Sequence, residues 1–146
     1  MKLTKQELYD LQVLGAFDGS FPSVDKNGFC VYRGHGGMRC GIGICISDEE
    51  YSPIMDNGDE PGYKLNFLVK KAVPPPDGMS ICDMADIQRC HDHSTFHTEE
   101  NTNGWDREGF FRNLNMLSFF HDVIKVEGRS FSKKKQNVAQ SNLEKW

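Results

Sequence analysis

The sequence predicts a single α+β domain that is mostly helical and carries one small β-hairpin. Its 146 residues suit one domain with a sizeable core. Apolar residues recur at helical spacing in several segments. One segment instead reads as two β-rich runs joined by a glycine turn. The 11 % of aromatic residues argues against a wholly disordered chain.

Two helices are predicted in the first third of the chain. Thr4 and Glu7 form the T-x-x-E pattern of a capping box, and leucines recur at three-residue intervals from Leu8. Gly15 is expected at or just past the end of this helix. Ser47, followed by three acidic residues, predicts the start of a short helix.

Three further helices are predicted downstream. Residues 63–73 carry a helical apolar stripe that three prolines end abruptly. Ser80 is expected to cap the next helix, which holds His91 on its inner side. Residues 105–125 are expected to form the longest helix, because their apolar residues step by four, three, three and four positions. The other helices should pack around it, four or five in all.

The predicted hairpin lies in the glycine- and cysteine-rich stretch 28–51. Residues 29–33 and 38–46 would be its strands, and the sequence GHGG between them its turn. Gly41 and Gly43 weaken the second strand. They indicate either the close approach of another backbone or a switch into a short helix.

Charge divides the chain into two parts. Residues 1–124 hold 19 acidic and 11 basic side chains (net −8), and residues 125–146 hold 2 and 6 (net +4). We expect a globular domain over residues 1–128 and a weakly ordered basic tail over 129–146. The acidic body disfavours broad phosphate binding and favours a basic protein surface, or no partner. Lys133, Lys134 and Lys135 leave nucleic-acid binding as a weak alternative.

The sequence predicts a cytoplasmic protein. No apolar run approaches the roughly 20 residues that cross a bilayer, and the first ten residues carry charges where a signal peptide has its apolar core. Five cysteines are an odd number, so we expect thiols or metal ligands rather than a disulfide framework.

Cysteines and histidines offer a structural zinc site. The residues that together provide enough ligands are Cys30, Cys40, Cys45, Cys82, Cys90, His91, His93 and His97. The compact candidate set is Cys82, Cys90, His93 and His97. Because no C-x-x-C pair is present, the pattern assigns no cofactor, and exposed histidines and buried cysteines are the alternative.

Two other chemistries have candidate residues. A cysteine of the hairpin, Cys40 in the first instance, would need His91 and Asp92 beside it to act as a nucleophile. A hydrogen-bonded structural histidine is the alternative. The turn R-G-H-G-G between Arg33 and Arg39 offers amides to an anion, but it matches neither common phosphate-loop pattern.

Two segments together resemble a known group of proteins. The first reads C-x-Y-R-G, then R-C-G-I-G-x-x-I-S-D-E-E-Y-x-P-x-M, and the second is Q-x-x-H-D. The matching residues are Cys30, Tyr32, Arg33, Cys40, Gly43, Ile46, Asp48, Tyr51, Met55, Gln88, His91 and Asp92. The chain resembles, over about half its length, small uncharacterised proteins encoded by bacteriophages and prophages. It departs from them at Gly41, where they usually have Ala, and at Ser47, where they often have Pro.

The resemblance implies a viral protein of the host cytoplasm and no catalytic residues. It also implies that the hairpin and the helix end that carries the H-D pair belong together. We therefore expect a polar cluster, with an Arg33–Asp92 ion pair, that is structural rather than functional. Its members would be Tyr32, Arg33, Gln88, His91 and Asp92.

Three functions are consistent with these observations. The first is a non-enzymatic phage accessory protein that binds a host protein, in host takeover or as an anti-defence inhibitor. The second is a small enzyme or ligand-binding protein with a cleft between the hairpin and the His91 helix. The third and weakest is nucleic-acid binding through the basic tail.

Overall fold

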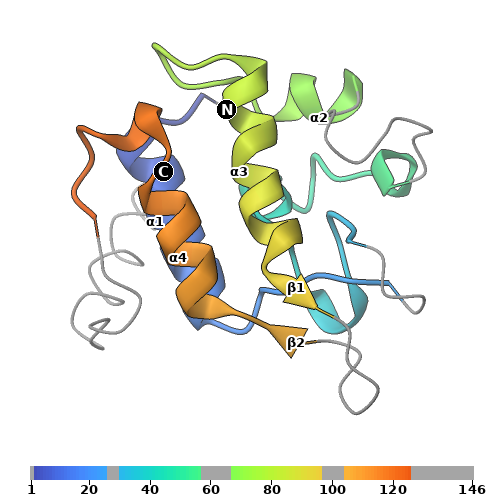
Figure 1. Cartoon of the computed structure of the whole chain (residues 1–146). Helices are drawn as coiled ribbons and strands as arrows, with labels where there is room; N and C mark the ends of the chain where they lie inside the picture. Colours follow the sequence, from blue (N-terminus) through green and yellow to red (C-terminus); the bar gives the residue numbers. More distant parts are fainter. Residues whose placement is uncertain (1, 26–29, 57–66, 97–103, 126–146) are drawn as a thin grey trace.

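The computed structural model describes residues 2–25, 30–56, 67–96 and 104–125 (Figure 1). Its α-helices are α1 (Lys5–Phe17), α2 (Phe67–Ala72), α3 (Ile81–His93) and α4 (Arg107–Asn115). Short 3₁₀ turns are η1 (His35–Gly37), η2 (Gly43–Cys45), η3 (Pro53–Asp56) and η4 (Ser118–Phe120). Among these residues, no helix combines the length and apolar character that crossing a bilayer requires.

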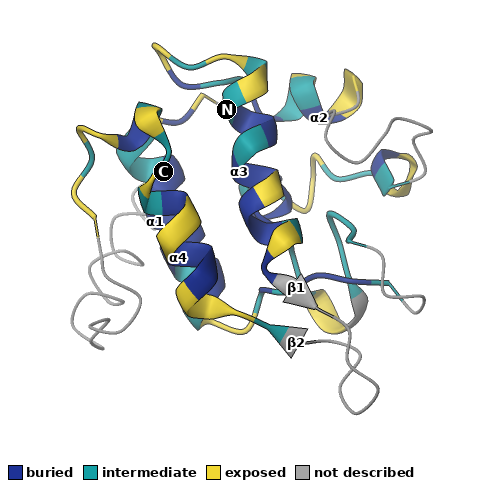
Figure 2. Cartoon of the chain, in the orientation of Figure 1, coloured by how far each residue is buried: buried dark blue, intermediate teal, exposed yellow. Residues whose placement is uncertain are grey.

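The core lies between α1, α3, α4 and the central segment 30–56. Helix α3 contacts α4, and α1 contacts η2. Buried and exposed residues alternate around α3 and α4 (Figure 2), as expected of helices that cover a core on one side. The most deeply buried large side chains include Leu8, Tyr9, Ile42, Ile46, Met84, Ile87, Phe110, Phe111, Leu114 and Phe120.

Helices α1 and α3 begin where the sequence predicts. Thr4 accepts a hydrogen bond from the Glu7 amide, and the Glu7 carboxylate accepts one from the Thr4 amide. Ser80 and Asp83 make the same reciprocal pair at the start of α3. Both capping boxes therefore satisfy amides that the first helical turn leaves without partners.

The predicted α+β class is wrong, because the described part of the predicted hairpin, residues 30–46, contains no strand. Its pairing is reduced to isolated bridges, such as Arg33 with Arg39. The GHGG turn is η1, and the second predicted strand contains η2. The described residues are mostly helical. Their extended pairing is minimal: β1 (Thr95–Phe96) lies antiparallel to β2 (Gly104–Trp105).

Gly43 lies at a close contact between two backbone segments. A Cβ atom at this position would collide with the carbonyl oxygen of Tyr32. The two backbones thus approach more closely than a side chain at position 43 would allow. Both readings of the glycines hold: another backbone lies against Gly43, and this residue opens the short helix η2.

The prediction of one long helix over residues 105–125 is also wrong. Helix α4 has 9 residues, whereas α1 and α3 have 13 each. Leu117 takes an extended conformation (φ −65°, ψ 124°), and the chain resumes as η4. The break turns Phe120 into the core, where its ring lies edge-on to Tyr9 at 5.4 Å. Ile124, expected on the apolar face, is exposed.

The helix predicted from Ser47 is a single capped turn. The Ser47 hydroxyl accepts a hydrogen bond from the Glu50 amide, but the turn stops at Tyr51. The turn does not continue because Pro53 disfavours helical geometry in the residue before it. Pro53 itself begins η3. Helix α2 ends before the three prolines, as predicted. The basic tail 129–146 and residues 63–66 lie outside the described residues.

Candidate functional site

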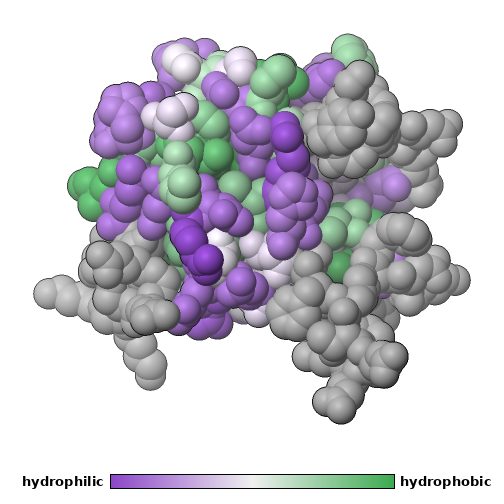
Figure 3. Space-filling view, in the orientation of Figure 1, coloured by the Kyte–Doolittle hydropathy of each residue, from purple (hydrophilic) through white to green (hydrophobic). Residues whose placement is uncertain are grey.

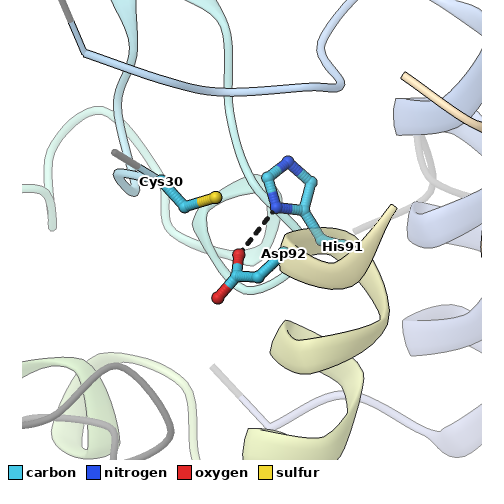
Figure 4. Close-up of side chains that lie close together, drawn as sticks. All are labelled: Cys30, His91 and Asp92. Atoms are coloured by element: carbon cyan, nitrogen blue, oxygen red, sulfur yellow. Dashed lines mark hydrogen bonds and ion pairs between the residues drawn. The ribbon is translucent and has the colours of Figure 1, made fainter. Parts of the chain in front are cut away.

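His91, in the last turn of α3, is fully buried and has both ring nitrogens hydrogen-bonded. Its Nδ1 lies 2.9 Å from Oδ1 of Asp92 (Figure 4), and its Nε2 accepts a hydrogen bond from the Ser23 amide at 3.1 Å. An amide can only donate, so Nε2 carries the lone pair and the proton is assigned to Nδ1. This proton is donated to the Asp92 carboxylate.

Gln88 extends this network into the central segment. Its Nε2 donates to Oδ1 of Asp92 at 2.9 Å, and its Oε1 accepts from the Ile42 amide at 2.9 Å. From α1, Gln12 donates to the Gly41 carbonyl at 2.7 Å. The three predicted cluster members on α3 therefore lie together, and two of them, Gln88 and His91, bind backbone amides at Ile42 and Ser23.

The thiol that approaches this pair is Cys30. The ligand atoms of Cys30, His91 and Asp92 all lie within 4.8 Å of one another. Figure 4 shows the Cys30 side chain pointing toward the ring and carboxylate. The arrangement is not a Cys–His–Asp catalytic triad, because the imidazole lone pair is engaged by the Ser23 amide and cannot take the thiol proton.

Cys40, the predicted nucleophile, is unsuited to that role. It is fully buried, and burial, followed by the nearby Asp92 carboxylate, raises the pKa of its thiol far above the ordinary value. Burial likewise raises the pKa of Cys45 and of Cys90 to about 12. These three thiols stay protonated near neutral pH and act as small apolar side chains.

Arg33 lies in a different cluster from His91. Its guanidinium donates to the carbonyls of Gly43 (3.1 Å) and Ile46 (2.6 Å) and to Asp48 (3.1 Å). The sequence predicts Asp92 as the ion-pair partner of Arg33, and the structure gives Asp48 in its place. Arg39 binds the same Asp48 oxygen at 3.1 Å. A carboxylate of the chain itself thus pairs with both arginines that flank the turn at which an anion was considered. Burial, followed by Arg39, lowers the pKa of Arg33.

Asp56 organises the backbone around Tyr32, and sequence reasoning missed it. It accepts hydrogen bonds from the Tyr32 amide and the Tyr51 hydroxyl, both at 2.6 Å. Burial, followed by these contacts with Asp56, raises the pKa of Tyr51 to about 12. In the sequence, Asp56 reads as part of an acidic turn, and no pattern marks it as a partner of a distant loop.

The predicted zinc ligands do not converge in the described residues. Cys82 is exposed and Cys90 is buried, and eight residues along a helix separate them by about 12 Å. His93 is exposed at the end of α3. His97 lies outside the described residues. The group formed by Cys30, His91 and Asp92 is instead the one set of possible metal ligands found in the described part of the chain.

Large apolar side chains are exposed in η3, in α2 and after α4. Ile54 in η3 is 60 % exposed, and Phe67 at the start of α2 is 74 % exposed, with Leu68 beside it. Met116 and Ile124 are exposed after α4. On the face drawn in Figure 3, the coloured part of the surface is mainly polar, with separate apolar areas.

No family model matches this chain, and no curated protein or solved structure is significantly similar to it.

Proposed function

We propose that this protein acts by binding another protein rather than by catalysis. The observation that carries the proposal is the exposure of Phe67, an aromatic side chain of which 74 % is accessible. Ile54 and Leu68 add further apolar area, and η3 and α2 lie on the same side of the molecule in Figure 1. Exposed apolar area of this kind is typical of protein interaction sites.

The charge of the body supports a partner with a basic rim. Residues 1–124 carry a net charge of −8. Complementary charge around an apolar contact accelerates association and excludes acidic competitors. The resemblance to phage and prophage proteins points to a protein of the bacterial host as the partner, and to host takeover or the inhibition of a defence system as the purpose.

The enzymatic alternative has less support. Its candidate base, His91, is buried with both nitrogens engaged, and its candidate nucleophile, Cys40, is buried and protonated. An active site needs a base whose lone pair can reach a substrate. Nucleic-acid binding would depend on Lys133, Lys134 and Lys135, which lie outside the described residues.

The experiment is a capture from bacterial lysate with three immobilised proteins: the wild type, Phe67→Asp and Met116→Asp. Met116 is the matched control, because it is exposed to a similar extent (77 %) after α4. The wild type and Met116→Asp should retain the same protein, identified by mass spectrometry, and Phe67→Asp should lose at least ~10-fold of it. A partner retained equally by all three would rule out this surface. Reproducible failure to retain any partner would reject protein binding itself.

A further inference from the structure

We propose that Cys30, His91 and Asp92 form a binding site for one transition-metal ion of the zinc class. Their ligand atoms all lie within 4.8 Å of one another. Ligand atoms around a tetrahedral zinc ion are about 3–4 Å apart. An ion would therefore draw the most distant pair together by roughly an ångström and push apart His91 Nδ1 and Asp92 Oδ1, which now lie 2.9 Å from each other. This inference is independent of the proposed protein binding.

The ligand types select the metal. One thiolate, one imidazole and one carboxylate suit Zn²⁺ or Co²⁺, whereas Mg²⁺ and Ca²⁺ prefer oxygen ligands alone. Three protein ligands leave a fourth position for water or an exogenous ligand. Cys30 is half-buried and the Asp92 side chain is 22 % exposed, so an ion can enter from their side.

Neighbouring groups already hold two of the ligands in place. Gln88 donates to the Asp92 carboxylate and is itself anchored by the Ile42 amide. The His91 ring packs against both Phe21 and Trp105, with centroids 5.2 Å and 5.5 Å away. Such outer contacts orient the ligands of metal sites and raise their affinity.

Metal binding requires a defined exchange of protons. The ion takes the position of the Nδ1 proton, which now lies between His91 and Asp92, and that proton transfers to Nε2 so that the ring stays neutral. The Cys30 thiol releases its proton to solvent and binds as thiolate. Nε2 then carries a proton that faces the Ser23 amide, so the hydrogen bond between them must break. Occupation of the site should therefore displace the backbone at Ser23.

The test is a titration of the full-length, reduced protein with Co²⁺ and then Zn²⁺. We expect one Co²⁺ per chain, with the thiolate charge-transfer band and the strong visible absorption of tetrahedral cobalt, and displacement of Co²⁺ by Zn²⁺. Cys30→Ser should abolish the charge-transfer band, and Cys30→Ser and Asp92→Asn should each weaken binding at least ~10-fold. In an amide NMR spectrum, the Ser23 signal should shift on addition of Zn²⁺.

Cys82→Ser is the matched control, because this exposed thiol lies on α3 outside the group. It should bind Co²⁺ like the wild type. A wild type that binds neither metal at micromolar concentration would overturn the proposal. It would equally be overturned if Cys82→Ser lost the charge-transfer band while Cys30→Ser kept it. Circular dichroism of each variant establishes that it is folded before its affinity is compared.

Discussion

The imidazole of His91 shows how one hydrogen bond decides the chemistry of a residue. The Ser23 amide fixes the proton on Nδ1 and leaves no lone pair for a thiol or a substrate. A histidine beside a cysteine and an aspartate would otherwise suggest nucleophilic catalysis. Here the ring joins α3 to the loop at Ser23.

Gln88 is the residue whose loss should disturb this network most clearly. Gln88→Leu keeps a similar volume but leaves the buried Ile42 amide without its acceptor and removes a donor from Asp92. We expect the free energy of unfolding to fall by about 1–3 kcal/mol. Denaturation by urea measures this change.

The control for Gln88→Leu is Arg89→Leu, one position along the same helix. Arg89 makes a half-exposed ion pair with Asp86, and such pairs contribute little. Its replacement should leave the urea midpoint nearly unchanged. Equal losses for the two variants would mean that Gln88 has no special role.

Helix periodicity predicts only part of this site. Residues three and four positions apart share a helix face, which brings Gln88 beside His91 and Asp92, but it was the resemblance that led us to expect these three residues in one cluster. Cys30, Ser23 and Asp56 reach their partners across long stretches of chain, and no local pattern encodes those contacts. For the same reason Arg33 was assigned to Asp92 and not to Asp48.

At the scale of elements, the break after α4 determines the packing of the last described segment. A continuous helix would place Phe120 and Ile124 on one face. The extended Leu117 instead separates them, so that Phe120 is buried and Ile124 is exposed. Apolar spacing alone could not reveal the break, because both halves keep a helical pattern.

Phe120→Ala should therefore be among the most destabilising substitutions in the chain. Removing a fully buried aromatic ring that packs against Tyr9 leaves a cavity, and we expect a loss of about 3–5 kcal/mol. A continuous helix would bury Ile124 with Phe120, so Ile124→Ala is the comparison that tests the break: because Ile124 is exposed, it should change stability by less than about 0.5 kcal/mol. Thermal or urea unfolding distinguishes these outcomes, and similar values for both variants would contradict the break.

The strands predicted in the central segment do not form because its backbone groups make hydrogen bonds to side chains and not to a second strand. Arg33 binds the carbonyls of Gly43 and Ile46, and Asp56 binds the Tyr32 amide. The β-formers that suggested strands are present, but their backbone bonds to side chains. Helix starts at Thr4 and Ser80 were predictable because capping is local.

At the scale of the whole molecule, burial sorts the five cysteines by reactivity. Cys82 is exposed, Cys30 and Cys45 are half-buried, and Cys40 and Cys90 are buried, while burial keeps the thiols of Cys40, Cys45 and Cys90 protonated. In the folded protein, an aromatic disulfide reagent should modify Cys82 first and spare Cys40, Cys45 and Cys90 until denaturant is added. Mass spectrometry of the modified peptides identifies the order. Early labelling of Cys40 would contradict the packing around η2.

Two of these thiols, Cys45 and Cys90, should make the folded state less stable at high pH. In the unfolded chain they ionise near the ordinary pKa of 9.0, but in the fold Cys45 and Cys90 hold their protons to about 12. The unfolded state thus binds fewer protons between these values, so stability should be full below pH 9 and fall as pH rises toward 12. Urea midpoints measured across this range, with Cys90→Ala as comparison, test the sign.

Gln12 and Gln88, which bind the backbone of Gly41 and Ile42, also lead to a prediction about the order of folding. Gln12 and Gln88 lie 29 and 46 positions from their backbone partners. Closing such loops costs entropy that is recovered only once both helices are in place. The central segment should therefore form after the transition state, and Gln88→Leu should accelerate unfolding while refolding keeps its rate. Stopped-flow measurements of both rates would reveal an early-forming segment by a slower refolding of this variant.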